Sequence, residues 1–389
     1  YAPAVDYTTT HPWWKNDDLL WDMLLDKTFS KPNLIQETGI MLVRSVDMRP
    51  WRSEQACADL LERKLITGLI ARGAGLVQWL WHINPYMTTQ NENSIGLVRA
   101  DGSAKPELNV MLEFGRLVQS LDTRLVEAAT PPEVWVVIPY SQWFLRPDLA
   151  IESTRRAIRV LGYDFGVIPQ MVAEQQLAEL ARAQHRPACI ILPGVQTFER
   201  EALRALCTFA QAGTTVLISG TLSLDPHYLT ETIDLIEQND DLSPVPVSRY
   251  EHLERASGEK LQLLFDHEKI AYVSKAHDQL KEYQLGDGRL VWSGLPLELS
   301  SNPSAVRTIY QDVLNRRARQ LDQDSPLLVV RRTLARGSLV LAVSESSSEQ
   351  HVQLDDGQVI AIASNRAGAV VFKEDQCVET FGGVALLKS

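Results

Sequence analysis

Apolar residues in the first 125 positions follow two alternating spacings. Short apolar runs at Asn33–Gln36 and Gly75–Trp81 have the length of buried strands. Helical spacing covers Asp17–Leu25, a stretch that begins after Ser53 and ends near Arg72, and Pro106–Leu121. Alternating strands and helices with right-handed crossovers predict a parallel sheet. With a first strand at Pro3 to Asp6, only three strands are expected, whereas a closed (β/α)8 barrel needs eight.

A domain boundary is predicted at Ala128-Ala129-Thr130-Pro131-Pro132, and beyond it strands and helices alternate again. This second pattern predicts a doubly wound α/β domain. Edge or hairpin strands and a last helix are expected at its end. The expected strands are Val134–Pro139, Phe165–Ile168, Ala188–Pro193, Thr215–Ser219, Leu261–Tyr272 and Arg289–Ser293, and the helices are Leu149–Leu161 (ended by Gly162), Ala173–Arg182, Arg200–Ala212 and Pro303–Leu314.

From Pro326 the pattern changes to alternating strands without helices, with turns at Asp355-Asp356-Gly357 and Gly382-Gly383. This predicts a small antiparallel β domain. The division is therefore an N-terminal α/β part at 1–127, an α/β domain at 128–324 and a β domain at 325–389.

Composition and charge exclude several classes of protein. The net charge of -11 leaves no basic face for nucleic acid. No apolar run reaches the 18 or so residues of a membrane span, so we expect a soluble protein, either cytoplasmic or exported. The four cysteines are far apart and show neither zinc-site nor disulfide-framework spacing, and no metal or cofactor is expected. Residue 1 is Tyr, so the start looks processed or truncated and reveals nothing about targeting.

Glu37 is the strongest candidate for chemistry. It directly follows the strand Asn33–Gln36 and precedes the turn Thr38-Gly39. Barrel enzymes keep their catalytic groups at the carboxyl ends of buried parallel strands. A surface or capping role is the alternative for an arbitrary glutamate, but aromatic residues follow the neighbouring strands. Carbohydrate hydrolysis uses this combination, because one carboxylate attacks the sugar, a second carboxyl protonates the leaving oxygen, and aromatic rings pack against sugar C–H faces.

The neighbouring strand ends supply further candidates for a sugar-binding cleft. His11 and Trp13 lie in the segment His11-Pro12-Trp13-Trp14, and Trp81 ends the strand that begins at Gly75. Glu92 lies in the long loop that follows. Each also has a structural alternative. His11 could be a loop histidine bonded to a backbone group, the tryptophans could be packing residues, and Glu92 could be a solvated surface acid.

The α/β domain suggests a second hypothesis. Ala188 to Gly194 followed by a helix is similar to a class I amidotransferase sheet, which needs a cysteine at a strand-to-helix elbow. Cys189 falls inside its strand and Cys207 inside a helix, and no glycine-rich phosphate loop is present. A structural role is therefore favoured for this domain.

The chain resembles the C-terminal two-thirds of clan-A retaining glycoside hydrolases, most closely the family-42 β-galactosidases. Ala4 to Pro12 resembles the sixth barrel strand of that family, Gln36-Glu37-Thr38 the seventh, and Gly75 to His82 the eighth. The loop through Asn91-Glu92-Asn93 to Asp101-Gly102 resembles the family's return over the site. The resemblance implies barrel strands 6–8, then a flavodoxin-like trimerisation domain, then a small β-sandwich.

The same resemblance implies roles for individual residues. Glu37 takes the place of the nucleophile, Trp81 packs against sugar, and Glu92 accepts from a sugar hydroxyl. Ile95 stands near the position of a family histidine, a departure that bears on galactose specificity. Strands one to five, with the acid/base glutamate, are missing, and Asn91-Glu92 follows the wrong strand to replace them.

We therefore expect a retaining glycosidase acting on β-linked sugars, most like a β-galactosidase. An N-terminal half-barrel segment or partner chain would supply the acid/base, and the assembly would be a trimer. β-Mannosidase or β-glucosidase specificity is the alternative within enzymes. A catalytically silent carbohydrate-binding or assembly subunit is the alternative outside them.

Overall fold

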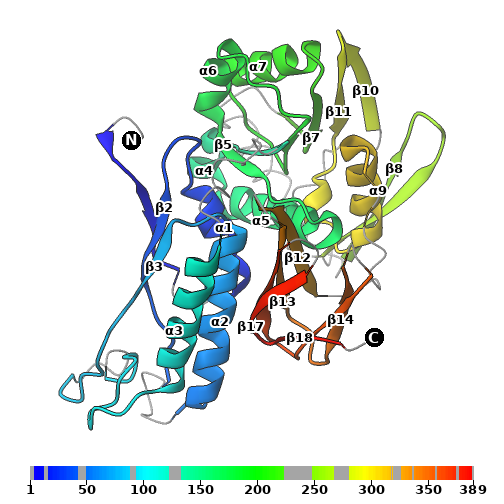
Figure 1. The fold of residues 1–389 in the computed structure, drawn as a ribbon. Coiled ribbons are helices and arrows are strands. Elements are labelled where there is room, and N and C mark those ends of the chain that lie inside the picture. The colour runs from blue at the N-terminus through cyan, green and yellow to red at the C-terminus, as the bar shows by residue number, and fades with distance from the viewer. Residues whose placement is uncertain are drawn as a thin grey trace. The chain divides into compact units, whose positions relative to one another are not determined.

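The protein forms two compact units (Figure 1). One comprises Tyr1–Thr130, Gly166–Ile168 and Gln320–Ser389, and the other Pro131–Phe165 and Pro169–Arg319. The structure, a computed structural model, describes residues 4–12, 16–42, 50–87, 93–121, 133–222, 248–266, 280–316, 318, 326–334, 337–354, 357–373 and 376–387.

The first unit begins with a three-stranded parallel sheet of order β1-β2-β3. β1 is Thr8–Thr10, β2 is Asn33–Thr38 and β3 is Gly75–Gln78. β1 thus begins later than the predicted first strand, and β3 ends before the two tryptophans that the sequence placed in it. β2 is longer than predicted and includes Glu37, because the carbonyl of Thr38 accepts a hydrogen bond from the amide of Trp79 (2.7 Å).

Three helices accompany this sheet: α1 (Asn16–Leu25), α2 (Glu54–Ile70) and α3 (Pro106–Ser120). The predicted cap of α2 is confirmed, because the Ser53 hydroxyl accepts from the amide of Ala56 (3.1 Å). At its other end, Arg72 adopts a left-handed conformation that terminates the helix. α2 packs against α1, α3 and the C-terminal strands, so it buries charged as well as apolar side chains (Figure 1).

The described residues from 326 onward form strands and connecting turns without helices. One antiparallel sheet has the order β12-β13-β16-β17 and a second has the order β14-β15-β18. Apolar residues of both sheets form one buried core that includes Val340, Ile360 and Val370. The strands are β12 (Leu327–Thr333), β13 (Ser338–Ser344), β14 (Gln350–Gln353), β15 (Val359–Ile362), β16 (Ala367–Lys373), β17 (Gln376–Gly382) and β18 (Val384–Leu386).

A buried carboxylate joins α2 to these strands. Glu62 is paired with the guanidinium of Arg366 and accepts from the amides of Ala367 (3.1 Å) and Gly383 (3.0 Å). Saturation by charge-assisted bonds is what allows a carboxylate to remain buried. The last strands of the chain are thereby attached to a helix of its first third.

The second unit is built on a six-stranded sheet of order β10-β11-β7-β6-β4-β5. All neighbours are parallel except β10, which forms a hairpin with β11. α6 and α7 pack on one face, while α5 and α9 contact β4 and β7 (Figure 1). The strands are β4 (Val134–Ile138), β5 (Gln170–Ala173), β6 (Cys189–Leu192), β7 (Thr215–Ser219), β10 (Leu280–Leu285) and β11 (Gly288–Ser293), and the helices are α4 (Tyr140–Leu145), α5 (Pro147–Arg159), α6 (Leu177–Arg182), α7 (Arg200–Gln211) and α9 (Pro303–Leu314).

Two predicted elements of this unit are wrong in position. The strand expected at Phe165–Ile168 lies later in the chain, as β5 at Gln170–Ala173. Gly166 has a positive φ of 65°, which is incompatible with an extended strand at the expected position. The helix expected to end at Gly162 continues through it as a π-helical turn, Val160–Asp164, which keeps Leu161 fully buried. β8 (Ser248–Glu254) and β9 (Lys260–Asp266) form a separate antiparallel hairpin. No described helix is long and apolar enough to span a membrane.

Candidate functional site

Glu37 lies where the central strand of the three-stranded sheet is irregular. β2 pairs with β3 through Leu34–Gly75 and Ile35–Leu76, and then through Thr38–Gln78. From Ile35 to Thr38, β2 moves on by three residues, while β3 moves on by two, from Leu76 to Gln78. One extra residue in one strand is the pattern of a β-bulge. Bulges change the direction of a side chain near a strand end. Here the bulge includes Glu37, whose side chain is 28% exposed.

His11 follows β1 and approaches Glu37. Its Nδ1 lies 3.9 Å from Glu37 Oε2, and its side chain is 47% exposed. This separation is too long for a direct hydrogen bond, and it leaves both groups accessible to a ligand. The structure therefore brings together two of the residues that the sequence singled out.

The strand ends around Glu37 are tied to one another through Thr38 and Lys64. The Thr38 hydroxyl donates to the carbonyl of Pro12 (3.0 Å). The buried ammonium of Lys64, on α2, donates to Pro12 O (3.1 Å), Thr38 Oγ1 (2.9 Å) and Gly39 O (3.2 Å). Burial, and the nearby charge of Arg52, lower the pKa of Lys64 to about 7.

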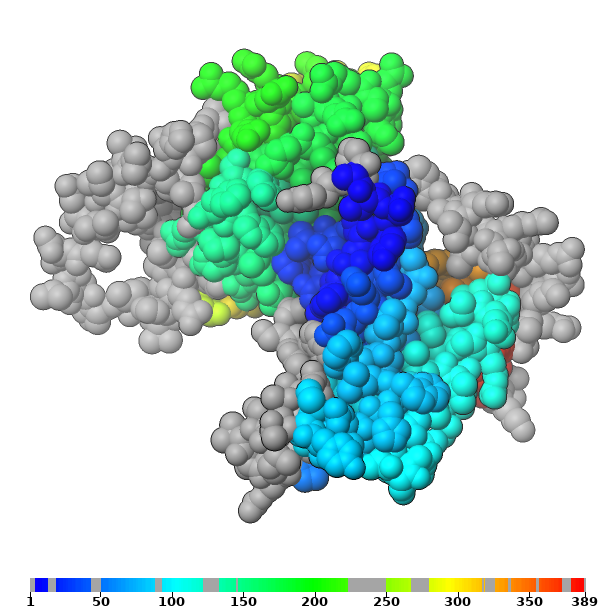
Figure 2. Space-filling model, turned by 90° about the vertical axis from the view of Figure 1, so that its left-hand side faces the viewer, coloured from blue at the N-terminus to red at the C-terminus, as the bar shows by residue number. Residues whose placement is uncertain are grey.

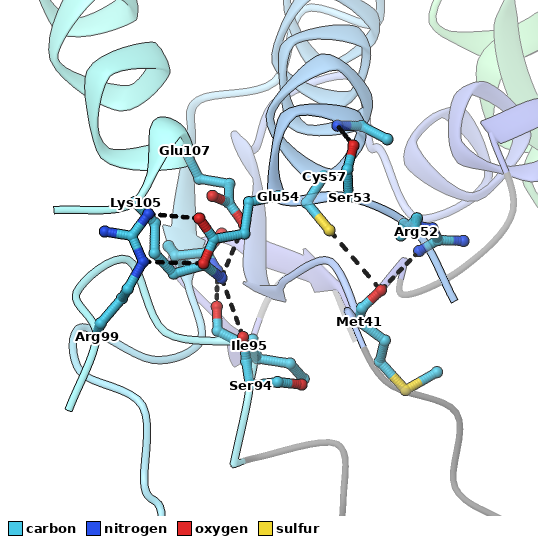
Figure 3. Close-up of polar contacts among 12 residues, drawn as sticks. Met41, Arg52, Ser53, Glu54, Cys57, Ser94, Ile95, Arg99, Lys105 and Glu107 are labelled. Carbon is cyan, nitrogen blue, oxygen red and sulfur yellow. Dashed lines mark hydrogen bonds and ion pairs between the residues drawn. The ribbon is translucent and has the colours of Figure 1, made fainter. Parts of the chain in front are cut away.

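Gly39 allows the end of β2 to lie close to the segment after β3. A Cβ atom at this position would lie 2.6 Å from Ile95 Cγ2 and 2.7 Å from the carbonyl oxygen of Trp79. Either distance is a clash, so only glycine fits. Directly beyond it, Arg52 donates to the carbonyl of Met41 (3.0 Å), and the Cys57 thiol lies against the same oxygen (Figure 3).

Aromatic side chains are exposed after β3 and beside β1. Trp81 is 66% exposed, and Trp79 is exposed as well. Tyr7 and Val77 also lie at the surface. β2 lies between β1 and β3 in the sheet, and Figure 2 shows this N-terminal part of the chain on one face. Exposed indole rings are suited to packing against sugar faces.

The loop that returns after β3 is anchored at its base. Arg99 forms a bidentate pair with Glu54 at the start of α2 and donates to Ser103 Oγ (3.0 Å). Lys105 is almost fully buried, and its Nζ contacts Ser94 O (3.0 Å) and Glu107 Oε1 (2.9 Å) (Figure 3). These ion pairs fix residues 94–105 against α2 and α3, on the side of the sheet where Glu37 lies.

Two predicted site residues, Trp13 and Glu92, lie outside the described residues, and their roles stay predictions. The anchoring residues Lys64, Thr38 and Arg99 were not predicted from the sequence. Lys64 stands in the charged run Glu62-Arg63-Lys64, which is typical of a solvated helix face and gave no signal of burial.

At the carboxyl ends of the six-stranded sheet, by contrast, the polar groups are occupied by contacts within the protein. In open α/β sheets, ligands bind where the strand order reverses, which here is between β4 and β6. The side chain of Gln142 crosses this point: its amide donates to Gly194 O (3.1 Å) and its oxygen accepts from the amides of Gln196 and Thr197. A protein side chain thus occupies the place that a ligand would take.

Two carboxyl groups at the same edge are also saturated. Glu174 accepts from the amide and hydroxyl of Ser141 and from the amide of Glu199. Glu298 accepts from the hydroxyls of Ser219 and Tyr310. Burial raises the pKa of both carboxyls.

The cysteines of this unit do not form a nucleophile site. Burial raises the pKa of Cys189, inside β6, to about 12, and it also raises that of Cys207, inside α7. Reactive cysteines need the opposite shift. Within the described residues, no group of three or more His, Cys, Asp or Glu side chains is arranged to hold a metal ion.

Comparisons with known proteins identify the fold. No protein-family model matches the chain, and no curated protein matches it. Solved structures do match. Gan42B, a GH42 β-galactosidase from G. stearothermophilus, has a TM-score of 0.63 and 14% identity over 96% of this chain and 60% of its own. A β-galactosidase from Bacillus circulans sp. alkalophilus has a TM-score of 0.61 and 11% identity over 94% of this chain and 60% of its own.

A cold-adapted β-galactosidase from Rahnella sp. R3 matches in the same way, with a TM-score of 0.59, 11% identity, and coverage of 96% of this chain and 61% of its own. The chain thus spans about three fifths of the length of the structures it matches. The resemblance to family-42 β-galactosidases is confirmed at the level of the fold. Coverage of nearly all of this chain and only part of theirs is the pattern expected of a portion of that fold.

Proposed function

We propose that this chain is the C-terminal part of a retaining glycoside hydrolase acting on β-linked sugars, most like a β-galactosidase. Glu37 is the nucleophile. The observation that carries the proposal is the place of Glu37: a partly exposed carboxylate, in a bulge at the carboxyl end of the central parallel strand, beside His11. The fold of β-galactosidases supports it.

The other site residues take supporting roles in this proposal. His11 and Trp13 bind sugar beside β1, and Trp81 offers its exposed ring to a sugar face. Glu92, from the returning loop, accepts from a sugar hydroxyl. The buried pairs of Arg99 and Lys105 hold the base of that loop.

A second carboxyl group is needed from elsewhere. A retaining mechanism places the acid/base about 5 Å from the nucleophile. Within the described residues, β1 and β3 are the edges of the sheet, and Tyr7 and Val77 are exposed beside them. Exposed edges with apolar neighbours favour pairing with further strands. We propose that a half-barrel segment or partner chain pairs there and supplies the acid/base.

The second unit mediates assembly in this proposal. Counted from β4, its parallel strands have the order 2-1-3-4-5, which is that of flavodoxin-like folds. Its ligand position is filled by Gln142, and burial raises the pKa of both of its cysteines. A domain without visible chemistry is available for self-association, and a trimer is proposed from the resemblance. Sedimentation as a monomer at micromolar concentration would contradict this.

A mechanism-based 2-fluoro-β-galactoside tests the central assignment. The chain is incubated with the reagent alone and together with the complementary half-barrel, and labelled peptides are identified by mass spectrometry. Covalent label on Glu37, only in the combined form, is expected. Label on another carboxylate overturns the assignment. Turnover of an aryl β-galactoside by the chain alone contradicts the missing acid/base, and Glu92 then becomes its first candidate. Sugar binding without label or turnover would instead favour a silent binding subunit.

A further inference from the structure

Lys64 is a titratable residue buried against the ends of the strands that carry His11 and the proposed nucleophile. It lies on α2, a helix of the same unit, and only 2% of it is exposed. Among the described residues, its ammonium contacts three acceptors, which belong to two different strand ends. Pro12 O follows β1, Thr38 Oγ1 ends β2, and Gly39 O follows β2.

These three acceptors are next to the residues that face the site. Pro12 directly follows His11, and Thr38 directly follows Glu37. Thr38 is also tied to the third strand end, because its carbonyl accepts from the amide of Trp79 (2.7 Å). The ammonium contacts add to β1–β2 pairing and to the Thr38–Pro12 hydrogen bond, and so help to fix the distance between the backbones of His11 and Glu37.

Packing alone does not explain a lysine at this position. Taking an ammonium group out of water is costly, and a methionine would fill a similar volume without that cost. Charge-assisted hydrogen bonds offset part of this cost, and the rest appears in the lowered pKa of Lys64. Those bonds are made here to backbone and hydroxyl groups of the site.

We propose that Lys64 is a positioning residue that holds Glu37 and His11 at their catalytic separation. The proposal rests on the glycosidase function proposed above. Lys64 is not a catalytic residue, because its ammonium is buried and bonded to backbone and hydroxyl groups. Its effect on the reaction is exerted through the backbone of Pro12 and Gly39.

The test compares two lysines of similar chemistry in the form of the protein that hydrolyses an aryl β-galactoside. Lys64→Met removes the ammonium and its contacts with little change in volume. Lys27→Met is the matched control, because Lys27 Nζ also donates to two backbone carbonyls, Ala71 O (3.2 Å) and Arg72 O (2.7 Å), but these lie at the C-terminal end of α2. Rates are normalised to the amount of Glu37 labelled by the fluorosugar, so loss of folded protein does not count as loss of rate.

Lys64→Met is expected to lower kcat per labelled site by about 100-fold, the effect of a misplacement of about 1 Å, with a smaller change in KM. Lys27→Met should keep the wild-type kcat even if it lowers the melting temperature. An unchanged kcat per labelled site in Lys64→Met overturns the proposal. If Lys64→Met does not fold, Lys64→Arg is measured instead, because it keeps the charge but moves the donors. It should lower kcat at least tenfold, and a wild-type rate overturns the proposal.

Hydrogen exchange separates failure of this inference from failure of the proposed function. Lys64→Met should speed exchange of the Trp79 amide, which donates to Thr38 O, while the amides within α2 stay protected. If the wild-type protein neither turns over substrate nor takes up label, the glycosidase proposal fails, and local loss of protection still supports the positioning of the strand ends. Unchanged protection overturns it.

Discussion

The two parallel sheets of this protein carry glutamates at their carboxyl ends, and the two ends differ in one physical respect. Glu37 is partly exposed, and the contact that the structure gives its carboxylate is the 3.9 Å approach of His11. Glu298 is buried, and both of its oxygens accept hydrogen bonds from hydroxyl groups. A carboxylate that reacts must keep its oxygens available, whereas one that stabilises a fold is saturated. The carboxylate of Glu37 is therefore available to a ligand, whereas that of Glu298 is used within the fold.

The largest effect is expected at the open carboxylate. Glu37→Gln keeps the volume but removes the attacking charge, so kcat/KM for an aryl β-galactoside should fall by about four powers of ten. The melting temperature should hardly change, because the side chain makes no close polar contact in the described part of the structure. Glu113→Gln, an exposed position on α3, is the control and should keep full activity. An equal loss of kcat/KM in Glu37→Gln and Glu113→Gln would contradict a specific role for Glu37.

The buried carboxyl should give the converse result. Glu298→Ala leaves the hydroxyls of Ser219 and Tyr310 without their acceptor and creates a cavity, so the second unit should lose about 3–5 kcal/mol of unfolding free energy. Activity of the protein that remains folded should not change. Denaturant unfolding measures the first effect and fluorosugar-normalised kcat the second. A drop in that kcat would place Glu298 in the chemistry.

A smaller loss of unfolding free energy is expected at Gln142, whose side chain fills the position between β4 and β6 where related sheets bind a ligand. Gln142→Ala removes the groups that satisfy Gly194 O and the amides of Gln196 and Thr197, so unfolding should become easier by about 2–3 kcal/mol. Gln142→Glu is the matched variant, because its carboxylate can still accept from the two amides but cannot donate to Gly194 O. It should be intermediate in stability. Full stability of Gln142→Ala would show that the amide does not fill this position.

The smallest effect is the pH dependence of stability. Burial raises the pKa of Glu298 above its ordinary value of 4.5, so above that pH the unfolded chain releases a proton that the folded chain retains. The stability contributed by Glu298 is therefore complete below pH 4.5 and falls as pH rises toward the folded-state pKa. Glu298→Gln, which stays neutral, should lack this slope. Parallel stability curves for the two proteins between pH 4 and 8 would contradict the raised pKa.

Much of the fold follows from local patterns. The 12 residues of α9 were predicted without error, and Ser53 was correctly identified as the cap of α2. These elements depend on apolar spacing and on capping chemistry, which act within a few residues. The position of Glu37 at the end of a buried parallel strand also came from local pattern, because Pro32 and Gly39 bound the apolar run.

Errors arose where distant contacts decided the outcome. The bulge in β2 is set by pairing with β3, about 40 residues away, so no local pattern could show that the strand continues through Glu37 to Thr38. Gly162 would end an isolated helix, yet burial of Leu161 keeps the backbone helical through it. The three-domain division, the roles of Trp13 and Glu92, and the trimer stay predictions.

The sequence by itself determined which residues were candidates for chemistry, because residue types and the ends of apolar strands can both be read from local sequence. Only the tertiary structure decided which of them are available. Lys64 and Glu62 stand in one charged run that is typical of a solvated surface, yet both are buried, one on the ends of β1 and β2 and the other on the C-terminal strands. Hydrogen bonding across the fold settles such cases, since a charged group is buried only where distant segments supply its partners.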